Sequence, residues 1–164
     1  MRRLRLCAVV GLLLGGCGYH LRGSDVETQV DAVYVRAAPS VDIAEQLTQN
    51  LRRSGVTVLD QSDANVVTID LLEQQQDRRT VTTTEQAQAA EYRLEVSVRY
   101  RIVGAGDVEL VAERWAKGSR VFPVDRNNLV GTSQEQVLMR NEIASDVVAQ
   151  ILRSLAAATK NAAH

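Results

Sequence analysis

The sequence feature that most constrains the fold is a strict alternation of apolar and polar residues over positions 92–102. Apolar side chains occupy every second position, namely Tyr92, Leu94, Val96, Val98, Tyr100 and Ile102. Polar side chains lie between them, namely Arg93, Glu95, Ser97, Arg99 and Arg101. Because successive side chains of a β-strand point to opposite sides of the sheet, this pattern predicts a strand with one buried and one accessible face.

The predicted strand turns back at 104–107 (GAGD) into a second strand over 108–120. The loop length decides which residues face each other. A three-residue loop gives the pairs Ile102–Leu110, Tyr100–Ala112, Arg99–Glu113 and Glu95–Lys117. A two-residue loop would set Ile102 against Glu109 and bury that carboxylate, which costs several kcal/mol. We therefore expect the three-residue loop.

Further strands and two amphipathic helices are expected around this hairpin. The segments 32–37 and 66–72 predict strands, and 74–90 is interpreted as strand extensions around a connection. The first helix is expected to be capped by Ser40 and to end at Gly55. Its apolar stripe is Ile43, Leu47 and Leu51.

A last helix is expected to begin at Ser133, because Gln136 follows at the spacing of a capping box. Its expected apolar side consists of Val137, Ala144, Val147, Val148, Ile151 and Leu155. Two helices and one sheet, each with a single apolar face, bury those faces most simply against each other. The predicted fold class is therefore α+β, with two helices packed on one face of a four-stranded sheet in the order β-α-β-β-β-α.

The first sixteen residues have the pattern of a secretory signal. Three arginines precede an apolar run over 6–14, which is too short to cross a bilayer as a helix, since a span needs about 20 residues. Small residues (Leu14-Gly15-Gly16) then precede Cys17, and this arrangement resembles the lipobox of bacterial lipoproteins. In such proteins the cysteine thiol receives a diacylglyceryl group, and the signal is cleaved just before it. We therefore expect a signal peptide over 1–16, a lipidated tether over 17–30 and a single domain over 31–164.

Composition and motifs exclude several classes of function. The chain has 19 Lys+Arg and 20 Asp+Glu, and loss of the three signal-peptide arginines changes the formal net charge from −1 to −4. A nucleic-acid binder would carry a basic excess instead. No HExxH, GxSxG or P-loop pattern occurs, and His20 and His164 have no metal-site or triad spacing. We expect neither an enzyme nor a metal or cofactor, apart from the covalent lipid on Cys17.

The accessible face of the predicted hairpin is the candidate binding surface. It carries Arg93, Arg99, Arg101, Val111, Trp115 and Lys117, and Arg120 and Arg126 follow toward the last helix. One interpretation is a solvated face whose exposed ion pairs each contribute roughly 0–1 kcal/mol. The other is a contact surface for a partner or for an anionic lipid headgroup, because a tryptophan flanked by arginines is typical of an interface anchor.

Several motifs resemble the LptE family of lipopolysaccharide-assembly lipoproteins. They are CGYHLRG at 17–23, AEYRL at 90–94, DRNN at 125–128 and QEQ at 134–136. The resemblance implies two helices on a four-stranded sheet, in agreement with the elements above. It also implies an outer-membrane lipoprotein that faces the periplasm and plugs the lumen of the LptD β-barrel. There it assists barrel assembly and delivery of lipopolysaccharide to the cell-surface leaflet.

The partners implied by this resemblance are an LptD-type barrel, lipopolysaccharide and the membrane, with no nucleic acid. Glycine at position 18, rather than aspartate, favours the outer membrane among lipoproteins. The family's lipid-contact stretches correspond to 82–88 and 129–133, which contain no Lys or Arg, so no contact residue is carried over. The candidates for lipopolysaccharide or partner contact remain Arg93, Arg99, Arg101, Trp115, Lys117 and Arg126. The alternative function is a lipoprotein accessory of another envelope complex, such as the barrel-insertion machinery.

Overall fold

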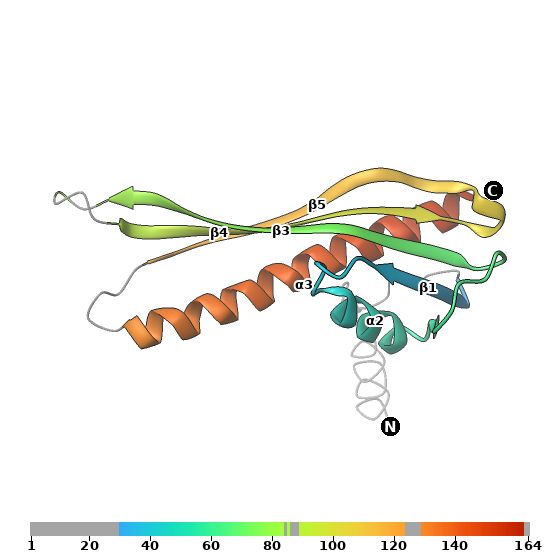
Figure 1. The fold of residues 1–164 in the computed structure, drawn as a ribbon, viewed down its shortest axis with the longest axis horizontal. Helices are drawn as coiled ribbons and strands as arrows, with labels where there is room; N and C mark the ends of the chain where they lie inside the picture. Colours follow the sequence, from blue (N-terminus) through green and yellow to red (C-terminus); the bar gives the residue numbers. More distant parts are fainter. Residues whose placement is uncertain (1–29, 84, 86–88, 124–128, 163–164) are drawn as a thin grey trace, which may run out of the picture.

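The computed structural model describes residues 30–83, 85, 89–123 and 129–162 (Figure 1). The elements are β1 (Ala32–Ala37), α2 (Ala44–Arg53), β2 (Thr57–Leu59), β3 (Val67–Thr83), β4 (Ala89–Val103), a 3-10 turn (Ala105–Asp107), β5 (Glu109–Pro123) and α3 (Leu129–Ala162). The expected signal peptide, Cys17, nearly all of the tether and Arg126 lie outside the described residues.

The strands form one sheet of five in the order β2-β1-β3-β4-β5. β1 runs parallel to both β2 and β3, whereas β4 runs antiparallel to both β3 and β5. Both helices lie on the same face of this sheet, α3 along β4 and β5 and α2 beside β1 and β2 (Figure 1). The α+β class is confirmed. The four-strand count and its element order are wrong, because β2 has only three residues and is too short to show an alternation.

The long strand β3 extends well beyond the predicted segment 66–72, as far as Thr83. Its second half is polar even on the face that the helices cover. There its side chains form hydrogen bonds with polar groups of other segments. The Gln74 side-chain oxygen accepts the backbone N–H of Asp42 at 3.0 Å, and the Asp42 carboxylate accepts from the amides of Gln74 and Gln76. Gln74 therefore takes the capping role expected of Ser40, and α2 begins at Ala44 without a side-chain cap of its own.

The pairing of β4 with β5 differs from the expected register. The first pair, Val103–Glu109, fits the three-residue loop, but two irregularities follow between Val103 and Tyr100. Each irregularity adds one residue to β5, as β-bulges do. The four expected pairs are therefore wrong, and the observed ones include Ile102–Val111, Tyr100–Arg114, Arg99–Trp115 and Ser97–Lys117. Because the two shifts together amount to two residues, residues beyond the bulges keep their expected faces.

α3 begins at Leu129, four residues before the expected cap Ser133, and supplies most of the helical part of the core. The residues of the expected stripe from Ala144 to Leu155 are buried, but Val137 is 53% exposed. A helix repeats every 3.6 residues, so positions four and seven before Ile143 face the sheet. These are Met139 and Gln136, which places Val137 on the outer side.

α3 packs closely against the sheet at Gly118 of β5. A Cβ atom at this position would lie 2.8 Å from Cγ2 of Ile143 and 3.3 Å from its backbone oxygen. We expect Gly118→Ala to lower the free energy of unfolding by about 1–3 kcal/mol, because the helix must move outward. Urea unfolding monitored by circular dichroism measures this, with Ser119→Ala as a control that points away from α3. Equal stability of the two variants would show that α3 does not pack closely at Gly118.

Candidate functional site: the open face of the sheet

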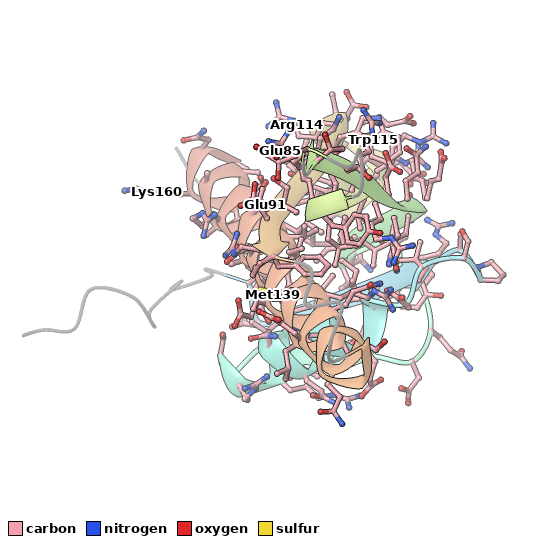
Figure 2. All side chains as sticks on the ribbon, turned by 90° about the vertical axis from the view of Figure 1, so that its left-hand side faces the viewer. Glu85, Glu91, Arg114, Trp115, Met139 and Lys160 are labelled. Atoms are coloured by element: carbon pink, nitrogen blue, oxygen red, sulfur yellow. The ribbon has the colours of Figure 1, made fainter. Side chains whose placement is uncertain are left out.

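The side of the sheet opposite α2 and α3 is here called the open face. Strand register places on it Arg36, Asp70, Glu73, Asp77, Arg79, Arg93, Glu95, Arg99, Arg101, Glu113, Trp115 and Lys117. Figure 2 looks along the molecule and shows Trp115 on the side of the sheet away from α2. The structure thus brings five of the six predicted contact residues onto one surface, and the sixth, Arg126, lies outside the described residues. Val111 was assigned to this face wrongly, because the bulges turn it toward the core.

Trp115 and Arg99 form the centre of the open face. The Arg99 guanidinium donates to Glu113 at 2.7 Å and contacts Glu73 at 3.0 Å. It also lies 5.9 Å from the centroid of the Trp115 ring, and Nζ of Lys117 lies at the same distance. Cations this close to an aromatic face contribute about 0.5–1 kcal/mol each at exposed sites. Arg99 is therefore committed to carboxylates within the chain, whereas Trp115 remains half-exposed.

Asp70 organises the neighbouring part of the open face. Its carboxylate is almost fully buried and accepts one hydrogen bond from Nε of Arg36 at 2.6 Å and one from Nε of Arg101 at 2.8 Å. The hydrogen bond to Asp70 raises the pKa of the Arg101 guanidinium above its ordinary value. An equivalent hydrogen bond to Asp77 raises the pKa of Arg79. The guanidinium groups of Arg101 and Arg79 therefore stay charged at any pH the protein meets.

Arg93 and Lys117 differ from the other cations of the open face. Among the described residues neither makes an ion pair within 4.0 Å. Lys117 of β5 pairs in register with Ser97, and Arg93 of β4 pairs with Val121, so both cations lie on the same side of Arg99 along the strands. The open face thus combines internally neutralised arginines with two available cations and one large aromatic ring, which is a composition suited to contact with a protein or a lipid headgroup.

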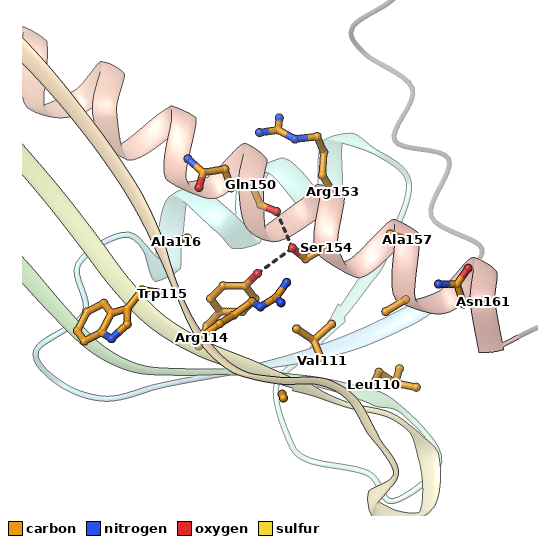
Figure 3. Close-up of a pocket in the computed structure, with 13 residues that line it drawn as sticks. Leu110, Val111, Arg114, Trp115, Ala116, Gln150, Arg153, Ser154, Ala157 and Asn161 are labelled. Atoms are coloured by element: carbon orange, nitrogen blue, oxygen red, sulfur yellow. Dashed lines mark hydrogen bonds between the residues drawn. The ribbon is translucent and has the colours of Figure 1, made fainter.

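A groove on the opposite side of the sheet, between β5 and the last turns of α3, was not anticipated (Figure 3). It encloses about 820 Å³, and its walls include Leu110, Val111, Arg114, Arg153 and Ala157. At its inner end the Tyr100 hydroxyl donates to Oγ of Ser154 at 2.8 Å. Arg114 escaped prediction because only the shifted register sets it opposite Tyr100.

Within the described part of the chain, no helix is long and apolar enough to cross a membrane. No group of three or more His, Cys, Asp or Glu side chains within that part could hold a metal ion.

The fold and the open face define a two-layer α+β domain in which the described helices cover one side of the sheet. Solved structures share this fold. A lipoprotein B from Nitrosomonas europaea has a TM-score of 0.73 at 23% identity, covering 87% of this chain and 93% of that one. Rare lipoprotein B from Shewanella oneidensis has a TM-score of 0.72 at 19% identity, covering 81% of this chain and 99% of that one.

Residues 30–155 match the family model of LptE, described as Lipopolysaccharide-assembly. The chain belongs to the LptE family. It is 29% identical over 108 residues to an LPS-assembly lipoprotein LptE of Photorhabdus laumondii, covering 63% of this chain and 59% of that relative. A second LptE, of Pectobacterium atrosepticum, is 23% identical, with 94% of this chain and 86% of the relative covered. The chain thus spans somewhat less than two thirds of the length of the first of these relatives.

The buried position of Asp70 generates a stability prediction. We expect Asp70→Asn to lower the free energy of unfolding by about 1–3 kcal/mol. The neutral amide has only one acceptor oxygen for the two arginines, and it removes the negative charge that strengthens both hydrogen bonds. The matched control is Asp77→Asn on the same strand and face, where both partners are well exposed and we expect a change within about 0.5 kcal/mol. Urea midpoints at constant m-value measure both changes. Indistinguishable midpoints would mean that Asp70 contributes no more than an ordinary surface carboxylate.

Proposed function

We propose that the protein is a non-enzymatic outer-membrane lipoprotein that plugs and helps to assemble an LptD-type β-barrel. In that position it would assist the delivery of lipopolysaccharide to the cell-surface leaflet. Membership of the LptE family supports this proposal. The observation that carries it in the structure is the open face, a long sheet surface around Trp115 that the described helices α2 and α3 leave uncovered.

The dimensions of the domain suit a plug. β3 has 17 residues and α3 has 34, which correspond to about 55 Å of strand and about 50 Å of helix. These elements run side by side in an elongated body (Figure 1). A rod of this length, stiffened by a continuous sheet and one helix, can fill a long lumen without relying on a partner for its own core.

The proposed anchor is the lipid on Cys17. Each buried methylene of an acyl chain contributes about 0.8 kcal/mol, and two anchoring signals already give stable attachment to a membrane. The tether 17–30 would then hold the domain close to the periplasmic side of the outer membrane, within reach of a barrel.

The transport role is tested by depletion of the protein in its native cells. We expect it to co-purify with a large β-barrel, and we expect lipopolysaccharide to accumulate at the inner membrane after depletion. Fractionation of membranes with quantification of lipopolysaccharide measures the second effect. A normal outer leaflet after depletion would refute the transport role. Co-purification with the barrel-insertion machinery alone would instead support the alternative, an accessory of another envelope complex.

The open face is tested by Trp115→Asp. We expect the variant to lose at least about 30-fold in affinity for the barrel, equivalent to about 2 kcal/mol, because the substitution removes the central aromatic anchor. Its free energy of unfolding should fall by less, about 1 kcal/mol, because the ring is half-exposed and contacts two cations.

Leu138→Asp provides the matched control, since Leu138 is an exposed apolar residue on α3 in the other layer. We expect this variant to bind the barrel like the unmodified protein. Co-purification from detergent extracts and urea unfolding separate binding from stability. Unchanged binding of Trp115→Asp would leave the open face as an ordinary solvated surface.

A further inference from the structure

Three strands bring two arginines and one aspartate to the same level of the open face. Arg36 of β1 pairs in register with Asp70 of β3, and Asp70 pairs with Arg101 of β4. The Asp70 side chain is 3% exposed, whereas those of Arg36 and Arg101 are 58% and 44% exposed. A buried carboxylate therefore holds two guanidinium groups that still reach solvent.

The two arginines use only part of their donor capacity on Asp70. Each donates through Nε, Arg36 to Oδ1 and Arg101 to Oδ2, and neither makes another hydrogen bond among the described residues. A guanidinium has five N–H donors in a rigid plane, so four remain on each side chain. Both planes are anchored at one edge, which limits the rotamer entropy that a ligand must overcome.

The charges of this group do not balance. Two guanidinium charges share a single carboxylate, which leaves one net positive charge and repulsion between two neighbouring cations. Glu109 and Glu113 of β5 also raise the pKa of Arg101, but β5 lies beyond β4, on the side of Arg101 away from Arg36. Glu113 is moreover bound by Arg99. The net positive charge of the group therefore lies above β3, between Arg36 and Arg101, where no carboxylate of β5 offsets it.

A small pocket lies at this position. It encloses about 330 Å³ and is lined by Arg36, Arg101, Asp70, Leu72, Ala37 at the end of β1 and Ala38 directly after it. The volume is ample for a tetrahedral oxyanion with part of its hydration shell.

We propose that Arg36 and Arg101 form a binding site for a phosphate group, with Asp70 as the residue that positions both guanidinium groups. A phosphate offers oxygens in several directions, so it can accept from two arginine forks at once and neutralise the charge that Asp70 leaves unbalanced. Arg99 is excluded from this role because two carboxylates already occupy it. This inference does not depend on the proposed function.

The test uses the full-length protein in neutral detergent micelles, with inorganic phosphate as the probe and chloride adjusted to keep the ionic strength constant. The arginine Nε–H signals in nitrogen-15 NMR spectra report the binding. We expect saturable shifts of Arg36 and Arg101, and at least ten-fold weaker binding in Arg36→Gln. The control Arg79→Gln removes an even more exposed arginine from the same face, and it should bind phosphate like the unmodified protein.

A second arm replaces inorganic phosphate with a short-chain phosphatidic acid. Binding at least ten-fold tighter than that of inorganic phosphate would identify a lipid headgroup as the occupant, and equal binding would identify the phosphate group alone. If Arg36→Gln does not fold, Arg101→Gln carries the same expectation. Linear shifts without saturation, or equal weakening in the Arg79→Gln control, would overturn the proposal.

Discussion

Close packing of α3 against one face of the sheet is the contact on which the rest of the structure depends. The apolar side of β4, from Leu94 to Ile102, is buried beneath the helix stripe that ends at Leu155. Gly118 permits this approach, since any side chain at that position would meet Ile143. The helix covers the sheet once, and no described element covers the other side. The polar residues of the alternating strands therefore lie on a surface where they contact water or pair with one another across strands.

Ion pairs across strands link many of the charged residues of the open face. Asp70 neutralises charge between β1 and β4, and Arg99 links Glu73 of β3 with Glu113 of β5. The more exposed pairs, those of Arg99, add little stability individually. They do determine which cations can bind a ligand, because a guanidinium that two carboxylates already bind would have to break those ion pairs first. The available groups are thereby reduced to Arg93, Lys117 and the outer edges of Arg36 and Arg101.

Much of this arrangement could be predicted from local pattern, and the failures have physical causes. The alternation over 92–102 identified a one-sided strand because burial acts on every second residue. The register of β5 could not be predicted, since the bulges near Ile102 depend on how the strands coil under α3. Val137 was assigned to the core because it is apolar, although the period set by Ile143 turns it outward. Arg36 and Asp70 are 34 residues apart in sequence and only parallel pairing of β1 with β3 joins them.

The distribution of charge also constrains any surface that covers the open face. Burying a cation without a partner costs far more than burying one that is already paired. A partner can therefore cover Arg99 with apolar or neutral groups, but it must supply acceptors opposite Arg93 and Lys117. Trp115 lies beside Arg99 and Lys117, and its ring would need an apolar pocket on the partner. The Arg36–Arg101 pair spans β3, with Arg36 on β1 and Arg101 on β4, so a partner can leave a phosphate at that site in place only if it leaves the Arg101 end of β4 uncovered.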